Sequence, residues 1–484
     1  MTAVDVAIVG GGFTGAVFAI HLSRMAERPL DIAIVEPRAR PGRGLAYDTD
    51  DPDHRLNAPL AVHLVYPDAP DHLRDWYEAQ GGAARDPEAL AADGNIYMRR
   101  GVFGRYVEEQ LRAHIDGNQS GSAIRHVRSR VLDAKRTEGG YRLTLDGGRE
   151  LSAGLAVIAT GYDRPHAPPP FDGPLSDGSG FLGDPWDTAR LRKIPADARV
   201  LLLGMAQTAS DAIAVLLRSG HRGPIAAVSR HGLRTRPRPE AGSGPPPDLV
   251  ERIVRPVSLF AAAHGRPASV RGLLRTLRSE AMRADAAGGT WLEPFADLRD
   301  SVWDLWPALP LAEKRRFLRH LRVWYDVHRF QLPPQIEVRI AEAEAAGQVS
   351  FEAATCVSAA RDGEALLVAL RRRGGGERRR ETFDAIVNCT GPGMRADRST
   401  NPLLRRLAAR GYAAPHPIGI GFGVDPECRA IGAGGRADPH LRIVGSPTYG
   451  AFADQQGASF ILLHLRRIMP GIVASLRRQG PAGR

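Results

Sequence analysis

Residues 4–36 read VDVAIVGGGFTGAVFAIHLSRMAERPLDIAIVE and decide the fold. An apolar run of β-forming residues leads into a glycine turn, an apolar-periodic helix follows, and a second apolar run ends on Glu36. Gly10, Gly12 and Gly15 have the G-x-G-x-x-G spacing, which permits a tight turn, a close approach of pyrophosphate to backbone, and close helix–strand packing. The helix N-terminus would face the phosphates, and Glu36 would accept a ribose hydroxyl. This stretch predicts a dinucleotide site; the alternative is a glycine-rich turn without a ligand.

Length and composition indicate a globular protein of two or three domains. The 484 residues are 43% hydrophobic and 25% charged, which is ordinary, and the net charge of +11 comes from scattered arginines without a basic stripe. We therefore expect no nucleic-acid partner. No signal-like segment opens the chain, and no apolar run approaches the roughly 20 residues that span a bilayer. We expect a cytoplasmic protein without a membrane partner.

Cysteine usage excludes several kinds of site. Cys356, Cys389 and Cys428 lie far apart and form no C-x-x-C pair. This spacing argues against a disulfide framework and a zinc site, and we predict no metal. It also excludes disulfide-reductase chemistry, which needs two neighbouring cysteines.

The strand–glycine turn–helix pattern occurs twice. A buried run at 200–203 leads into Gly204 and a helix-like segment at 210–219. Each copy is followed by alternating runs that predict an antiparallel β-meander, over 124–159 and over 349–389, and each meander leads into a Thr-Gly pair. Two nucleotide-binding units imply two nucleotides that meet in one reaction.

We therefore predict an α/β protein with two Rossmann-like dinucleotide-binding domains, each with an antiparallel β-meander, plus a helical insertion. The first domain is expected over 1–195 and the second over 196–380, with the helical insertion at 249–347. Residues 381–484 are expected to return to the first domain, because a late strand at 441–444 is followed by a glycine turn and a closing helix.

Seven motifs show a family resemblance across nearly the whole chain. They are GGGFTG (10–15), GLAYDTDDPDHRLNAP (44–59), RGVFGRY (100–106), ATG (159–161), DPW (184–186), YDVHRFQLPP (325–334) and NCTGPG (388–393). With them the chain resembles the two-dinucleotide-domain flavoprotein oxidoreductases, and in particular the bacterial group that contains the aspartate N-monooxygenases.

The resemblance implies FAD in the first site and NADPH as its reductant. In the enzymes it resembles, dioxygen adds to the reduced flavin to give a C4a-hydroperoxide, and a nucleophilic nitrogen or sulfur takes the distal oxygen. We therefore expect a flavin monooxygenase that N-hydroxylates a small, acidic substrate, such as the amino acid L-aspartate. Its partners would be that substrate and dioxygen, and a homo-oligomer is left open.

Candidate cofactor residues follow from the two glycine turns and from the resemblance. Those for FAD are Gly10, Gly12, Phe13, Thr14, Gly15, Glu36, Asn57, Val131, Thr160, Gly161, Asp454 and Gln455. Those for NADPH are Gly204, Ala206, Gln207, Thr208, Ser229 and Arg230. Asp454 and Gln455 are expected to open the last helix, and a simple N-terminal cap is the alternative for Asp454.

The second glycine turn departs from the pattern. Ala206 adds a methyl group where backbone should approach pyrophosphate, which would weaken or alter nicotinamide binding, while Ala209 at the third position is common where the 2′-phosphate form binds. Arg230 could pair with a 2′-phosphate, which favours NADPH over NADH. The alternative for Arg230 is a solvated arginine at a strand end.

Five residues are candidates for the reaction itself. Asn57 and Tyr47 would lie at the flavin ring, with a loop cap and a packed aromatic as alternatives. Arg100 would lie near the cofactor, or else at the surface at a helix start. His328 and Arg329 end a helix and could meet a substrate carboxylate, or form a structural ion pair.

Two other functions stay open. One is an NADPH-dependent flavin reductase or dehydrogenase that never holds the hydroperoxide. The other is a flavin-binding redox sensor whose altered second turn no longer takes NADPH.

Overall fold

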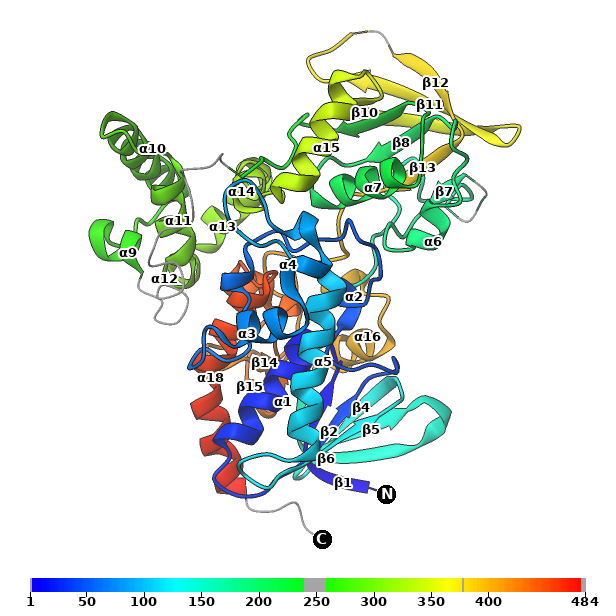
Figure 1. The fold of residues 1–484 in the computed structure, drawn as a ribbon. Helices are drawn as coiled ribbons and strands as arrows, with labels where there is room; N and C mark the ends of the chain where they lie inside the picture. The colour runs from blue at the N-terminus through cyan, green and yellow to red at the C-terminus, as the bar shows by residue number, and fades with distance from the viewer. Residues whose placement is uncertain (1, 177, 179, 239–257, 377, 480–484) are drawn as a thin grey trace.

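The computed structural model describes residues 2–176, 178, 180–238, 258–376 and 378–479. Two α/β lobes lie one above the other, and a group of helices projects from the side of their junction (Figure 1). We call these parts the first lobe, which holds the N-terminal strand, the second lobe, and the arm. Each lobe is built on its own sheet, so the predicted fold class is confirmed.

The sheet of the first lobe has the strand order β14-β15-β6-β1-β2-β3, and β4 and β5 join it through β6. Its strands are β1 (Thr2–Val9), β2 (Asp31–Val35), β3 (Ala123–Val127), β4 (Val131–Thr137), β5 (Gly140–Leu145), β6 (Glu150–Ile158), β14 (Arg429–Ile431) and β15 (Ala437–Ile443). The parallel strands at its centre are largely apolar and buried, because both faces of the sheet are covered. β15 pairs in parallel with β6, so the late strand lies in this first sheet.

Helices cover one face of this sheet, while the meander and one further helix cover the other. The covering helices are α1 (Phe13–Met25), α5 (Arg100–Asp116) and α18 (Ala458–Gln479) on one face and α16 (Pro402–Ala409) on the other. α18 is long and apolar enough to cross a membrane, with a mean hydropathy of 1.3 over the tested stretch. It lies beside α1 in the first lobe (Figure 1), and the apolar side chains of the two helices share one core, as in a core helix of a globular protein.

Short segments connect these elements. They are α2 (Gly44–Tyr47), α3 (His72–Ala79), α4 (Gly82–Arg85) and α17 (Tyr449–Phe452), with 3₁₀ turns at Leu60–Val62, Pro87–Ala89, Asp146–Gly148, Ala396–Arg398 and Ser446–Thr448.

The second lobe repeats this plan with the strand order β12-β11-β10-β9-β8-β13-β7. Its strands are β7 (Phe181–Leu182), β8 (Val200–Leu203), β9 (Ile225–Ser229), β10 (Val349–Asp362), β11 (Ala365–Arg372), β12 (Arg379–Phe383) and β13 (Ala385–Asn388). Its helices are α6 (Thr188–Leu191), α7 (Gln207–Arg218) and α15 (Pro334–Ala345). α7 and α15 share one apolar core with one face of the sheet, and the antiparallel strands share a second core with the other.

The arm begins at the junction of the two lobes and projects outward from it (Figure 1). Its helices are α9 (Leu259–His264), α10 (Val270–Ala286), α11 (Leu292–Asp300), α12 (Val302–Ala308), α13 (Leu311–His320) and α14 (Arg322–Arg329). The insertion was predicted at 249–347, of which 249–257 lie outside the described residues. α15 packs on α7 and β10, so it is a layer of the second lobe, and this end of the predicted insertion is wrong.

Strand pairing also moves the predicted domain boundaries. β7 pairs with β13, and Phe171 lies in the core of the second lobe, so the chain leaves the first lobe well before 195. β13 pairs in parallel with β8, so the predicted return at 381 comes too early. The two crossing segments lie side by side, joined by a bridge between Asp163 and Gly393.

The predicted meanders differ in one strand each. β3 pairs in parallel with β2, so only β4, β5 and β6 form the first meander. The last part of the second predicted meander, up to residue 389, divides between β12, antiparallel to β11, and β13, parallel to β8. Alternation along the sequence shows that a strand has two different faces, but it does not show which strand lies beside it.

Candidate active site

The first glycine turn joins β1 to α1. Gly10 has a φ of 105°, and a Cβ atom there would overlap the carbonyl oxygen of Ala159, which follows β6. Gly12 precedes α1, no side chain in the described part of the chain caps this helix, and its first turn carries no acidic residue. The N–H groups of Gly10 and Gly11 are bonded to Val35 and Glu36, so the N–H groups available to a phosphate are those at the start of α1.

Glu36 lies against this turn at the end of β2, where only 6% of it is exposed. Its carboxylate accepts hydrogen bonds from the backbone N–H groups of Gly11 (2.9 Å) and Arg38 (3.0 Å). The acid is thus fixed beside the glycines, in the position that the G-x-G-x-x-G pattern predicts for a ribose partner.

Two buried polar atoms near the ends of these strands lack a partner among the described residues. They are Thr160 Oγ1, after β6, and Gln455 Nε2, before α18. Gly161, with a φ of 74°, has open space around it. Because an unsatisfied buried polar group is costly, this arrangement fits a polar ligand such as the flavin.

Four of the predicted FAD residues are less open to a ligand. Phe13 and Gly15 are buried at the start of α1, and Thr14 between them is half-buried. Val131 is buried in the core between the sheet and the meander, so its side chain cannot be the contact, and only its backbone could reach a cofactor.

The second glycine turn repeats the geometry of the first. Gly204 has a φ of 117°, and a Cβ atom there would overlap the carbonyl oxygen of Cys389, just as Gly10 meets Ala159. Ala206 is exposed at the start of α7, and among the residues that the structure places none caps this helix. The turn is intact, and the extra methyl group stands where a phosphate would approach.

The remaining residues of the predicted NADPH site surround this turn. Gln207 donates to the carbonyl oxygen of Gln331 at 3.2 Å, and Thr208 follows it in α7. Ser229 accepts a hydrogen bond from the backbone of Gly232 at 3.0 Å. Arg230 is exposed and makes no ion pair with any described residue, so its guanidinium is available to a 2′-phosphate.

A cavity of about 730 Å³ lies where the lobes and the arm meet. The first lobe contributes the loop around Asn57, the second lobe the first turn of α7, and the arm α11 and the end of α14. All five residues predicted for the reaction line it, namely Tyr47, Asn57, Arg100, His328 and Arg329. Gln207 and Thr208 line it as well, so one space is open to residues of both predicted cofactor sites.

Arg100 joins the two lobes at this cavity. Its guanidinium pairs with Asp211 of α7 through two contacts, at 2.7 and 3.1 Å, and donates to the carbonyl oxygen of Arg55 at 2.8 Å. It also lies 5.7 Å from the ring centre of Trp186. Arg100 does start a helix, but it is not a surface arginine.

Arg329 and Asp454, predicted separately, form an ion pair in the cavity wall, with one contact at 3.1 Å. Both side chains are largely buried. α18 begins at Ala458, so Asp454 and Gln455 precede the helix and do not open it, and Asp454 is not its cap. Of the two alternatives for Arg329, the structural ion pair is the one observed.

Burial sets the protonation of the other lining groups. It raises the pKa of Tyr47, whose ring packs on Phe103, to about 12. It lowers the pKa of His63 to about 4, and His63 Nδ1 lies 3.0 Å from the carbonyl oxygen of Pro59. It also lowers the pKa of His328. The histidines are therefore neutral at pH 7.

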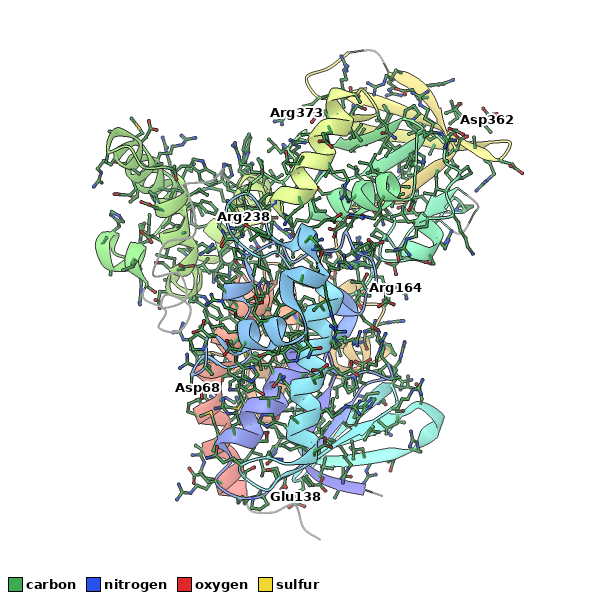
Figure 2. All side chains as sticks on the ribbon, viewed as in Figure 1. Asp68, Glu138, Arg164, Arg238, Asp362 and Arg373 are labelled. Carbon is green, nitrogen blue, oxygen red and sulfur yellow. The ribbon has the colours of Figure 1, made fainter. Side chains whose placement is uncertain are left out.

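Arg238 lines the same cavity and was not predicted. It lies where the first lobe, the second lobe and the arm come together (Figure 2). Its Nη2 donates to the carbonyl oxygen of Asn57 at 3.0 Å. The sequence around it is rich in proline and arginine without periodicity, so no pattern pointed to it.

Ion pairs hold the two lobes on either side of the cavity. Asp53 of the first lobe accepts from Arg218 of α7 at 2.7 Å and also pairs with Arg339 of α15. Asp51 pairs with Arg192 next to α6. The acids of this one loop thus contact three arginines of the second lobe.

Comparison with known proteins agrees with this geometry. Residues 7–163 match the FAD-NAD(P)-binding family model. The first lobe contains an FAD-NAD(P)-binding domain. No curated protein sequence matches the chain.

Several solved structures share the fold over nearly the whole chain. An ornithine hydroxylase from Pseudomonas aeruginosa is 17% identical, with a TM-score of 0.64, over 98% of this chain and 100% of that one. An L-lysine 6-monooxygenase from Pseudomonas syringae is 19% identical, with a TM-score of 0.64, over 99% and 100%. An ornithine N-hydroxylase from Kutzneria sp. 744, solved with reduced FAD, NADP+ and L-ornithine, is 16% identical, with a TM-score of 0.62, over 98% and 99%. At these identities the likeness shows the fold, a two-domain flavoprotein fold, and not the substrate.

Proposed function

We propose that this protein is an FAD- and NADPH-dependent monooxygenase that oxidises the amine nitrogen of a small acidic amino acid such as L-aspartate. The observation that carries the proposal is the cavity where the two lobes and the arm meet, lined by residues expected at the flavin and by the first turn of α7. The solved structures with this fold include N-hydroxylating enzymes, which supports the reaction class.

The residues present fit both cofactors. The uncapped N-termini of α1 and α7 would each take a pyrophosphate, and Glu36 would take a ribose hydroxyl. The unsatisfied Thr160 Oγ1 and Gln455 Nε2 suit a polar ring system, and the exposed Arg230 suits a 2′-phosphate. Bound flavin would supply the electron transfer and the activation of dioxygen, so the protein has to position the substrate and exclude water.

The cavity wall is suited to that task. Its apolar part includes the aromatic residues Tyr47, Phe295, Trp303 and Phe460, which would help to keep bulk water away from the reacting nitrogen. A neutral His63 adds no charge that would repel a substrate ammonium group.

The charges of the cavity support an acidic substrate. Four lining residues are arginines, and three are acids. Two of those acids, Asp211 and Asp300, are already paired with Arg100 and Arg299. Arg329 is paired with Asp454, so the lining arginine that has no ion-pair partner among the described residues is Arg238, and it favours a substrate that carries a carboxylate.

Turnover with product analysis tests the proposal. FAD-loaded protein would be reduced with NADPH without oxygen, then mixed with oxygen and L-aspartate, with L-lysine and L-ornithine in parallel. We expect NADPH to reduce the flavin, and L-aspartate alone to gain one oxygen atom per NADPH oxidised, as measured by mass spectrometry.

Two outcomes favour the rival functions. Hydrogen peroxide in the same amount as the NADPH consumed, with no oxidised amino acid, would identify a reductase or oxidase. A flavin that NADPH does not reduce would identify a binding protein or redox sensor. Oxidation of lysine or ornithine in place of aspartate would keep the monooxygenase and refute the acidic substrate.

A further inference from the structure

We propose that Arg238 is the residue that binds a carboxylate of the substrate in this cavity. The inference rests on the proposed function, and it names a specificity residue for the same site. It starts from the charge balance of the wall.

Three guanidinium groups, those of Arg238, Arg299 and Arg329, lie close enough in the wall to act on one another electrostatically. Arg329 is neutralised by Asp454, and Arg299 by Asp300 at 2.9 Å. Within the described ranges Arg238 makes no ion pair. Arg238 is therefore the cation of this cluster that has no ion-pair partner among the described residues.

The surroundings of Arg238 leave room for an anion. Among the described residues one of its five N–H donors has an acceptor, the carbonyl oxygen of Asn57, and its buried Nε has none. The guanidinium carbon of Arg238 lies over the ring of Tyr97, 5.7 Å from the centre of that ring. The neighbouring acid, Asp93, is occupied by the Tyr97 hydroxyl at 2.8 Å and the Asn95 backbone at 2.9 Å.

Desolvation gives this arrangement its affinity. Burial lowers the pKa of Arg238, and the charges of Arg299 and Arg329 act in the same direction, opposed by Tyr97 and Asp93. A guanidinium in such surroundings still stays protonated at pH 7 and gains most from a partner that brings a negative charge. A carboxylate matches its planar fork and would supply that charge.

A substrate carboxylate suits this position better than a cofactor phosphate. The turns before α1 and α7 already offer uncapped helix N-termini to the two pyrophosphates, and Arg230 is available to a 2′-phosphate. Arg238 contacts Asn57, the residue expected at the flavin ring. An anion bound there would lie beside the reacting centre.

Ligand binding to the oxidised, FAD-loaded protein tests this without turnover. L-aspartate, its two monoamides and succinate would be titrated by calorimetry into the wild type, Arg238→Gln and Arg236→Gln. Arg236 is the matched control, because it lies two residues earlier, is exposed, and stacks on Trp291 outside the cavity lining.

In the wild type we expect L-aspartate and succinate to bind, and one monoamide to bind more weakly. Arg238→Gln should weaken L-aspartate and succinate roughly 10- to 150-fold, the range for a hydrogen-bonded charge, and remove the preference over that monoamide. Arg236→Gln should leave all affinities within about twofold. The KM for NADPH and the FAD content should be unchanged in both variants.

Other outcomes overturn the inference. If Arg238→Gln weakens NADPH or loses FAD while carboxylates bind as before, Arg238 serves a cofactor phosphate. If carboxylates bind equally to the wild type and the variant, or to neither, Arg238 is not their site. If Arg238→Gln does not fold, Arg238→Lys replaces it, and we expect weaker carboxylate binding because lysine keeps the charge without the fork.

The proposed function can fail separately. Carboxylates that bind through Arg238 without any oxidised product would leave the binding site in place and refute the monooxygenase. If the wild type and Arg238→Gln both oxidise aspartate with equal KM, the monooxygenase is supported and Arg238 is refuted as the carboxylate-binding residue.

Discussion

Replacing Asp53 with asparagine should weaken the contact between the two lobes and lower the stability of the protein. Asp53 is 1% exposed and carries two of the ion pairs that join the lobes, to Arg218 at 2.7 Å and to Arg339. Asparagine keeps the shape but removes the charge, so both arginines lose a buried partner. Breaking a buried pair costs about 3–5 kcal/mol; because both arginines are partly exposed and water can solvate them, we expect about 2–3 kcal/mol.

The assay is the melting temperature of the FAD-loaded protein by scanning calorimetry. At about 2–4 °C per kcal/mol for domains of 150–250 residues, the loss corresponds to roughly 4–12 °C. Asp68→Asn is the matched control, because Asp68 makes the same kind of pair, with Arg24 at 2.6 Å, at the outer edge of the first lobe, where it is 63% exposed (Figure 2). An exposed pair contributes at most about 1 kcal/mol, so the control should melt close to the wild type. Equal shifts for the two variants would refute the reasoning that burial at the lobe junction makes Asp53 important.

Three further predictions follow from the turns and the buried histidines. Ala206→Gly should lower the KM for NADPH roughly 3- to 10-fold, a gain of about 1 kcal/mol, with FAD content unchanged; an unchanged KM would show that the methyl group is harmless. Gly10→Ala should yield protein without FAD or no soluble protein, because the new Cβ overlaps a carbonyl and the φ is unfavourable; a normal flavin spectrum would contradict this. Burial lowers the pKa of His63 to about 4 and of His464 to about 3, so the unfolded chain takes up these protons first and stability falls as the pH drops below about 6.5. Each should cost about 2 kcal/mol at pH 5, seen as a lower melting temperature than at pH 7, and His464→Phe should lose its share of this dependence.

The parts of the site that were predictable are local. The turns at Gly10 and Gly204, and the acid at Glu36, follow from a spacing within about 30 residues, because the backbone there must fit a ligand or another strand. The structure adds the reason, since each first glycine meets the carbonyl oxygen that ends a neighbouring strand.

The parts that were not predictable depend on distant contacts. The pair between Arg329 and Asp454 joins residues 125 positions apart, so neither residue's neighbours show it. Arg238 lies in an irregular stretch, where no periodicity marks which side chains are buried. The sequence of α15 predicts an amphipathic helix, but amphipathicity does not show which surface the apolar face packs on. Only the structure shows that α15 packs on the second sheet and does not belong to the insertion.

The position of β15 and α18 also sets an order of assembly during synthesis. β15 completes the sheet beside β6, and α18 covers α1, so the first lobe needs residues from both ends of the chain. The second lobe lies between the crossings at 163 and 393 and is contiguous except for the arm. A ribosome therefore releases everything the second lobe needs before it releases the last strand of the first. A chain that stops before residue 437 would carry one finished lobe and one open sheet edge, a surface that invites aggregation.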